Sequence, residues 1–287
     1  SVFRALAAPG EAVVMEAPTY WGAIVAARQA GLRIVPVARD GDAVAPEALQ
    51  EALQMSRARL FYAQPNFANP CGARWSPSQA AALLAVVRTE SAYLVEDDWA
   101  HDLGLEGPVI PVAALDTDGH VIHVRSLTKG VSPAIRVAAV TARGPVRARI
   151  QTDLTVDHLY VSGVLQAAAL DILTSTRRDA HLRTVRQHLR ARRDALVQLV
   201  RIHLPAGTLT RVPDGGFTLW LRLPPHTDAR TVADRCALAG VLVSPGDEWF
   251  PTEPTGPFLR LHYAGPHPAR FEEGVLALAQ AIDTESG

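Results

Sequence analysis

Short apolar runs alternate with helix-forming segments over the first half of the chain, and this alternation most restricts the possible folds. A short apolar run bounded by turn residues is typical of a buried strand, whereas proline in a first turn or glycine at an end marks a helix. The predicted helices end near residues 30, 55 and 90, and the predicted strands cover residues 12–18, 32–38, 60–65, 92–98, 120–126 and 137–142. This order predicts an α/β protein with a mostly parallel sheet that is wrapped by helices on both faces.

The second half of the chain has a different pattern. From Pro145 onward it becomes helical, and residues 179–203 form a predicted amphipathic helix with leucine and valine on one stripe. Beyond that helix we predict helices from about 229 and 268, a hairpin turn at 214–216, and strands at 209–212, 217–223, 241–243 and 258–263. We therefore predict two domains: residues 1–178 form a large domain without its N-terminal part, and residues 179–287 form a linking helix and a smaller α+β domain.

Composition and charge exclude several classes of protein. The chain has 287 residues and a formal net charge of −1, so no global field attracts nucleic acid or an anionic membrane. No apolar run approaches the roughly 20 residues that span a bilayer, and no CxxC or HExxH spacing supports a zinc site. Only Cys71 and Cys236 are present, which argues against a disulfide framework and favours a cytoplasmic location. The chain starts at Ser1 within an apparent helix that ends at Gly10, so we expect a piece of a longer protein.

Polar side chains gather at the ends of the predicted strands, which is where ligands bind in α/β sheets. Asn69 follows the third strand, Asp97 lies in a run of three carboxylates that ends the fourth, and Lys129 follows the fifth. Arg136 lies seven residues beyond Lys129, and Arg260 interrupts the last apolar strand, where an inward guanidinium needs a carboxylate to bind. Each also has an ordinary explanation: a turn at Asn69, a surface charge at Lys129, a structural ion pair at Arg260.

Lys129 is the only lysine of the chain, so the N-terminus is the only other amine that could react with an aldehyde. The chain has 28 basic residues, and the other 27 are arginines, which stay protonated and cannot form an imine. One chemistry would use all of these groups. In it a lysine forms an imine, a carboxylate binds a pyridine nitrogen, an arginine and a hydroxyl bind a phosphate, and a second arginine binds a substrate carboxylate. That combination is typical of pyridoxal-phosphate chemistry. An unrelated α/β enzyme in which Lys129 is incidental is a weaker alternative.

Six short segments occur in the order typical of one protein family. They are Glu16-Ala-Pro-Thr-Tyr20, Asn69-Pro-Cys-Gly72, Glu96-Asp-Asp-Trp99, Ser126-Leu-Thr-Lys129, Pro133-Ala-Ile-Arg136 and Phe258-Leu-Arg260-Leu. With these segments, almost the whole chain resembles the class I/II aminotransferases of fold type I. It most resembles the aminotransferase-like effector domain of the MocR branch of GntR-type transcription regulators, because residues 96–99 are similar to the EDDY motif of those regulators.

The resemblance implies a fold-type I architecture, pyridoxal 5'-phosphate as cofactor, and a role for each matching residue. Lys129 would hold the cofactor as an aldimine and act as a base, and Asp97 would pair with the pyridine nitrogen. Arg260 would bind the carboxylate of an amino acid or other amino compound. The remaining implied contacts are ring stacking by Tyr20, contacts of Asn69 and Trp99 with the phenolic oxygen, and phosphate contacts by Ser126 and Arg136.

Three residues depart from the family pattern. Trp99 stands where the family has tyrosine, and an indole can donate a hydrogen bond but cannot accept one or ionise. Ala134 and Cys71 replace a glycine and a threonine of the family motifs. The family's N-terminal portion and any winged helix-turn-helix are absent from the chain.

The resemblance implies a homodimer that would contact DNA only through a domain outside this chain. We interpret the chain as the effector domain of such a regulator, which transfers an amino group or senses an amino compound through Lys129. Two alternatives stay open: a free-standing metabolic aminotransferase, and a cofactor-binding sensor without turnover.

Overall fold

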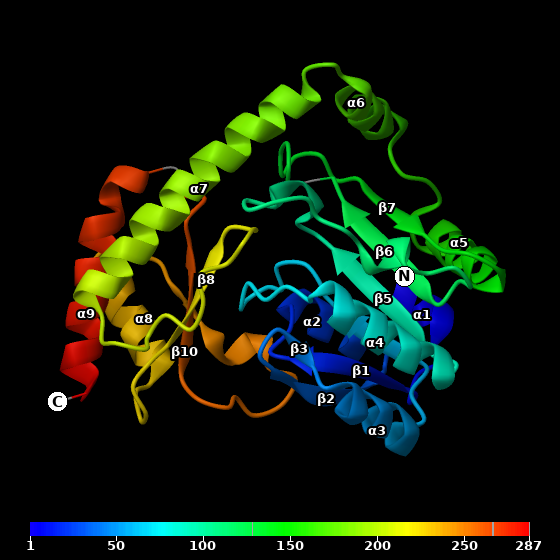
Figure 1. The fold of residues 1–287 in the computed structure, drawn as a ribbon, viewed down its shortest axis with the longest axis horizontal. Coiled ribbons are helices and arrows are strands. Elements are labelled where there is room, and N and C mark those ends of the chain that lie inside the picture. Colours follow the sequence, from blue (N-terminus) through cyan, green and yellow to red (C-terminus); the bar gives the residue numbers. More distant parts are fainter. Residues whose placement is uncertain (128, 266, 287) are drawn as a thin grey trace.

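The computed structural model describes residues 1–127, 129–265 and 267–286, so Thr128 of the Ser126–Lys129 segment lies outside the described residues. The larger sheet of the described residues has seven strands in the order β3-β2-β1-β4-β5-β6-β7 (Figure 1). Its five inner strands are parallel, whereas β3 and β7 are antiparallel to their neighbours at the two edges. The strands are β1 (Ala12–Ala17), β2 (Arg33–Asp40), β3 (Ala43–Val44), β4 (Leu60–Ala63), β5 (Tyr93–Asp98), β6 (Val121–Ser126) and β7 (Ala138–Thr141).

Side chains alternate along these strands and form two apolar layers, one on each face of the sheet. On one face Val14 and Phe61 pack with two helices, and on the other face Met15 and Leu60 pack with three. The first two helices are α3 (Pro46–Ser56) and α4 (Pro77–Thr89), and the other three are α1 (Val2–Leu6), α2 (Trp21–Gln29) and α5 (Pro145–His158). This arrangement confirms the predicted α/β fold with a mostly parallel sheet covered on both faces.

The helix ends follow from local chemistry. Ser76 Oγ accepts a hydrogen bond from the Gln79 N–H at 3.2 Å, and Gln79 Oε1 accepts one from the Ser76 N–H at 2.8 Å. This reciprocal pair is a capping box, and Pro77 at the first helical position needs no donor partner, so α4 begins where the sequence predicts. The first helix is shorter than predicted: α1 ends at Leu6, because Ala7 has extended backbone angles, and not at Gly10.

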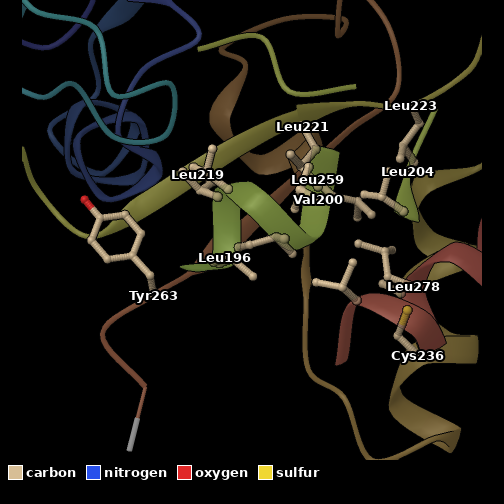
Figure 2. Packing of buried hydrophobic residues seen from close by; sticks show 14 of the residues in the cluster. Leu196, Val200, Leu204, Leu219, Leu221, Leu223, Cys236, Leu259, Tyr263 and Leu278 are labelled. Atoms are coloured by element: carbon tan, nitrogen blue, oxygen red, sulfur yellow. The ribbon is translucent and has the colours of Figure 1, made fainter. Parts of the chain in front are cut away.

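A second sheet of three strands, in the order β8-β10-β9, is joined to the larger sheet by the long helix α7 (Figure 1). The buried stripe of α7, which includes Leu196 and Val200, packs against Leu219, Leu259 and Leu278 from β8, β10 and α9 (Figure 2). The remaining elements are α6 (Gly163–Thr174), α7 (Arg178–His203), β8 (Thr218–Arg222), α8 (Ala229–Leu238), β9 (Ser244–Pro245), β10 (Phe258–His262), α9 (Phe271–Ser286), and the 3-10 helices η1 (His101–Leu103), η2 (Val112–Ala114), η3 (Gly246–Trp249) and η4 (Pro268–Arg270). The division into domains between residues 178 and 179 stays a prediction.

Two of the strands predicted for the second half are wrong. Residues 209–212 form no strand. The predicted hairpin around 214–216 is reduced to an isolated antiparallel bridge between Leu209 and Leu221, beside a hydrogen bond from the Arg222 N–H to the Thr208 carbonyl at 2.8 Å. Pro213 has no N–H to donate, and its carbonyl accepts a hydrogen bond from Arg193 Nη1 at 2.9 Å instead of from a strand. Residues 241–243 also form no strand; Val241 and Val243 pack against the apolar core just before β9.

The direction of the strands decides which loops can meet. The carboxyl ends of the five parallel strands lie at one edge of the sheet, where they present the segments after β1, β4, β5 and β6. Because β7 is antiparallel to β6, the residues that precede β7, including Arg136, lie at this same edge. Of the helices that the structure describes, none is long and apolar enough to cross a membrane.

Candidate functional site

A cavity of about 440 Å³ lies at the carboxyl edge of the larger sheet, and its wall also includes residues of β10 in the smaller sheet. Its lining contains every residue that the sequence singles out: Tyr20, Asn69, Asp97, Trp99, Ser126, Lys129, Arg136 and Arg260. The sequence did not single out its other lining residues, which are Trp21, Gln64, Val137, Ala138, Phe217 and His262. The structure thus brings all eight predicted residues to one site.

The three consecutive carboxylates at the end of β5 point to different places. Glu96 is buried and accepts two backbone N–H bonds at the start of η2, at 2.8 and 2.9 Å; burial raises the pKa of Glu96 to about 7. Asp98 pairs with His101 Nδ1 at 2.6 Å and with His123 Nε2 at 2.9 Å. Burial alone would raise the pKa of Asp98, but the two histidines outweigh burial and lower that pKa. Both carboxylates therefore serve the local structure, which leaves Asp97 for the cavity.

Asp97 is held by two donors that share one of its oxygens. Tyr62 Oη donates to Asp97 Oδ2 at 2.6 Å, and Gln64 Nε2 donates to the same oxygen at 2.8 Å. Among the described residues no hydrogen bond reaches Asp97 Oδ1. This oxygen can therefore accept a hydrogen bond from a donor in the cavity. Burial raises the pKa of Asp97, although its hydrogen bonds and the positive charge of Lys129 oppose the rise.

The side-chain amide of Asn69 is oriented by its surroundings. Gln64 Oε1 accepts a hydrogen bond from the Asn69 backbone N–H at 2.8 Å, which ties Asn69 to the partner of Asp97. Asn69 Oδ1 accepts from Arg260 Nη1 at 3.1 Å and from Trp249 Nε1 at 3.2 Å. Since two donors already bind Oδ1, the Nδ2 amide group of Asn69 is the part left to donate to a ligand.

Arg260 is a half-buried cation whose charge no described carboxylate neutralises by an ion pair. Its guanidinium lies 4.5 Å above the Trp249 ring, and its Nη2 is 3.5 Å from Ser244 Oγ. Its Nε is buried without a hydrogen-bond partner among the described residues. Burial lowers the pKa of Arg260 to about 10, so the side chain stays charged at neutral pH. The sequence also allowed a structural ion pair between Arg260 and a carboxylate, but no described residue forms one. The guanidinium is therefore available to an anion from the cavity.

Ser126 and Arg136 are brought together by the pairing of β6 with β7. Ser126 pairs with Ala138, and the Leu127 N–H donates to the Val137 carbonyl at 3.2 Å. Both Ser126 and Arg136 line the cavity. Lys129 belongs to the loop between the same two strands and is exposed on this wall.

Trp99 does not present its donor to the cavity. Its indole Nε1–H donates to the Phe67 carbonyl at 3.1 Å, and its ring meets the Phe217 ring edge-on at 5.0 Å between centroids. The side chain supplies an aromatic wall, but its N–H is already engaged within the protein. The phenolic-oxygen contact that the resemblance implies for Trp99 therefore gains no support from this geometry.

Several residues around the site escaped prediction for different reasons. Gln64 was detectable, since it is a polar residue at the end of a predicted strand. His262 follows Arg260 by two positions and so shares its face of β10, a period-two signal. His262 is exposed at the edge of the cavity, and its partial loss of solvent, together with the charges of Arg260 and Lys129, lowers its pKa. No sequence pattern indicated Trp249, because its contacts depend on how η3 packs against the loop that contains Asn69.

Solved structures of aminotransferases share the fold of this chain. The structure superposes on the multiple substrate aminotransferase of Thermococcus profundus with a TM-score of 0.93 at 25% identity, covering 99% of this chain and 72% of that one. It superposes on LysN, the α-aminoadipate aminotransferase of Thermus thermophilus complexed with N-(5'-phosphopyridoxyl)-L-leucine, with a TM-score of 0.92 at 27% identity, covering 99% and 74%. The fold is that of the fold-type I aminotransferases, as predicted.

Sequence comparison then assigns the family. The model of the family "Aminotransferase class I and II" matches residues 1–278, so the chain belongs to that family. The chain is 31% identical to the HTH-type transcriptional regulator YdcR of Escherichia coli K12 over 282 residues, and 26% identical to the regulator YdfD of Bacillus subtilis 168 over 275 residues. It is 25% identical to aromatic-amino-acid aminotransferase 1 of Thermococcus litoralis over 283 residues.

The matches cover unequal shares of the relatives. The match to YdcR includes 97% of this chain and 60% of YdcR, and the match to YdfD includes 95% of this chain and 56% of YdfD. The match to the Thermococcus litoralis enzyme includes 96% of this chain and 68% of that enzyme. The predicted resemblance to both the regulators and the aminotransferases is therefore confirmed for an aminotransferase-like domain.

Proposed function

We propose that the chain binds pyridoxal 5'-phosphate in the 440 Å³ cavity and recognises an amino acid or another amino compound beside it. The single observation that carries this proposal is the position of Lys129. The only lysine of the chain lines one cavity with Asp97, Asn69, Arg136 and Arg260.

The donor set of the cavity fits this cofactor. Asp97 Oδ1 and Asn69 Nδ2 have no partner among the described residues and match a protonated pyridine nitrogen and a phenolic oxygen. Arg136 and Ser126 offer a cation and a hydroxyl to a phosphate. The ring of Tyr20 would stack on the cofactor ring, and Lys129 Nζ would hold its aldehyde carbon.

The remaining roles follow from charge and position. When bound, pyridoxal phosphate supplies a ring that withdraws electrons from the α-carbon of an amino acid. Asp97 keeps a proton on the pyridine nitrogen, because an ionised carboxylate raises the pKa of a neighbouring base. Arg260 binds the carboxylate of the ligand through its two Nη groups, and Lys129 Nζ moves the α-proton as a general base.

We further propose that this domain is the effector domain of a MocR/GntR-type transcription regulator in the cytoplasm. The supporting observation is the match to regulators such as YdcR, of which the chain spans 60%. DNA would then be bound by a winged-helix domain outside this chain, and the effector domains would form a homodimer. The alternative is a free-standing class I/II aminotransferase, which the match to the Thermococcus litoralis enzyme supports.

One observation favours a second candidate, a sensor that binds the cofactor without turnover. The Trp99 N–H is engaged by the Phe67 carbonyl, so Asn69 is left as the donor that we propose for the phenolic oxygen. A panel of amino acids mixed with the loaded protein separates the two candidates. Conversion of the cofactor to its amino form in a single turnover supports the aminotransferase, and binding without conversion supports the sensor.

The proposal predicts a visible absorbance band that depends on Lys129. Wild-type protein mixed with pyridoxal phosphate and freed of excess cofactor should retain the band. Lys129→Ala should lose it, and Lys129→Arg should also lose it, because arginine keeps the positive charge but cannot form an imine. A band of equal intensity in either variant would contradict the proposal.

A further inference from the structure

Trp249 lies outside the cavity lining but contacts three elements that form the cavity. It is the last residue of η3, its side chain belongs to an aromatic cluster with Trp220, Phe250 and Phe258, and it is only 2% exposed. Packing alone would explain a buried tryptophan. Its polar and electrostatic contacts, however, are all made with segments that supply candidate ligand-binding residues.

The first contact orients the amide of Asn69. Trp249 Nε1 donates to Asn69 Oδ1 at 3.2 Å, next to the bond from Arg260 Nη1 to the same oxygen at 3.1 Å. A carboxylate that binds Arg260 would compete for the Nη groups and weaken the Arg260–Asn69 bond. The indole N–H cannot be drawn away in this manner, so it keeps Oδ1 occupied and leaves Nδ2 facing the cavity.

The second contact supports Arg260 itself. The centre of its guanidinium lies 4.5 Å from the centroid of the Trp249 ring, within the range of a cation–π interaction. This interaction stabilises a half-buried cation that has no ion-pair partner among the described residues. The flat ring also restricts the plane of the guanidinium and hence the direction of its two Nη groups.

The third contact involves the segment that leads to Tyr20. The Thr19 N–H donates to the Trp249 carbonyl at 2.8 Å, one residue before the proposed stacking residue. Any residue at position 249 can supply this carbonyl. Substitution of the Trp249 side chain therefore keeps this contact and alters only the other two.

We propose that Trp249 is a positioning residue that couples the cofactor partner Asn69 to the carboxylate-binding Arg260. Its N–H holds the Asn69 amide in the donating orientation while Arg260 binds a carboxylate, and its ring face sets the guanidinium plane. This inference rests on the proposed function, since it takes Asn69 and Arg260 in the roles given there.

The test uses two substitutions that divide the side chain into its parts. Trp249→Phe removes the N–H and keeps an aromatic face for Arg260, whereas Trp249→Leu removes both. Trp220→Phe is the matched control: Trp220 is in the same cluster, 6.1 Å from Trp249 between ring centroids, and it does not line the cavity. The probe is 3-phenylpropanoate, a carboxylate without an amine.

The first readout is the pH midpoint of the visible cofactor band, with and without 3-phenylpropanoate. A donor to the phenolic oxygen favours its ionised form, so loss of that donor raises the midpoint. We expect 3-phenylpropanoate to raise the midpoint of Trp249→Phe further than that of wild type. The excess should be roughly half to one pH unit, the equivalent of one ordinary hydrogen bond.

The second readout is the affinity of the loaded protein for 3-phenylpropanoate. Trp249→Phe should bind it within about twofold of wild type, whereas Trp249→Leu should bind it roughly three- to tenfold more weakly, because the cation–π contact is lost. Trp220→Phe should match wild type in both readouts. A Trp249→Phe variant that matches wild type, or a Trp220→Phe variant that shows the same changes, overturns the inference.

Wild-type protein provides a readout that needs no stable variant. In the loaded protein, the indole N–H signal of Trp249 in an NMR spectrum should shift when 3-phenylpropanoate binds Arg260, and an unchanged signal would count against the coupling. The outcomes also distinguish a failure of the proposed function from a failure of the role of Trp249. Absence of the visible band in wild type overturns the proposed function, whereas a normal band with unaltered variants overturns only the role of Trp249.

Discussion

At the scale of single residues, the run Glu96-Asp97-Asp98 shows how a strand assigns different tasks to adjacent side chains. Alternation places Glu96 and Asp98 on one face of β5 and Asp97 on the other, where it meets Tyr62 and the cavity. The sequence could predict that these carboxylates need partners, and it singled out Asp97 by resemblance. It could not predict the histidine partners of Asp98, because they come from a neighbouring strand and from η1.

The raised pKa of Glu96 predicts a dependence of stability on pH. Its pKa is about 7 in the folded protein against an ordinary value of 4.5, so the folded state retains a proton that the unfolded state has lost between these values. The contribution of Glu96 to stability is therefore full below pH 4.5 and is lost as the pH rises through 7. Between pH 4.5 and 7, the titration of Glu96 makes the free energy of unfolding fall by up to about 1.4 kcal/mol for each unit by which the pH rises.

Chemical denaturation between pH 4.5 and 8 measures this effect. We expect Glu96→Gln to remove the contribution, so that the difference from wild type changes with pH. Glu51→Gln, on the exposed face of α3, should follow the wild-type curve. Parallel curves for wild type and Glu96→Gln would show that Glu96 titrates normally.

At the scale of elements, the sequence predicted the larger sheet far better than the smaller one. Strands β1, β4, β5 and β6 and helices α3, α4 and α7 lie close to their predicted positions, because apolar runs, prolines and caps are local signals. The segment 209–212 has a strand-like composition, but Pro213 follows it and it makes a single bridge. The position of β9 also depends on pairing with β10, which no local pattern specifies.

The capping box of α4 predicts a measurable contribution to stability. Ser76→Ala removes the side-chain acceptor of the Gln79 N–H and should lower the free energy of unfolding by about 1 kcal/mol. Thr89→Ala, at the exposed C-terminal end of the same helix, is the control and should be neutral or slightly stabilising. Equal stability of Ser76→Ala and wild type would mean that another group replaces the cap.

At the scale of the whole molecule, the site requires both sheets. The larger sheet supplies Asp97, Asn69 and Lys129, and the smaller one supplies Arg260, so the packing of α7 and the second sheet decides whether the cavity is complete. The order of the motifs indicated which residues belong together. Their spatial relation, and the contribution of Trp249 between the two parts, required the three-dimensional structure.

A surface on α5 and α6 bears on the proposed homodimer. These helices and their connection carry exposed large apolar side chains: Val156, Leu159, Tyr160, Val161, Val164, Leu170 and Leu173. A concentration of exposed large apolar side chains in one stretch of the chain is typical of an interface between proteins. If a second copy of the chain buries this surface, the homodimer that the family resemblance implies is supported.

Sedimentation analysis tests this assignment. Leu170→Glu should shift the protein toward monomer, because a charge would be buried at the interface. Ile202→Glu places the same change on an exposed position of α7, 63% exposed, and should leave the oligomeric state unchanged. A wild-type protein that is monomeric at all accessible concentrations, or a Leu170→Glu variant that assembles like wild type, would contradict it.

The proposed function depends on a single covalent bond between Lys129 and the cofactor, and reductive trapping detects that bond. The protein is incubated with pyridoxal phosphate, reduced with borohydride, digested and analysed by mass spectrometry. We expect a phosphopyridoxyl group on the peptide that contains Lys129, and none on that peptide in Lys129→Arg. An unmodified Lys129 peptide, or a label found only on the N-terminal amine of Ser1, would contradict it.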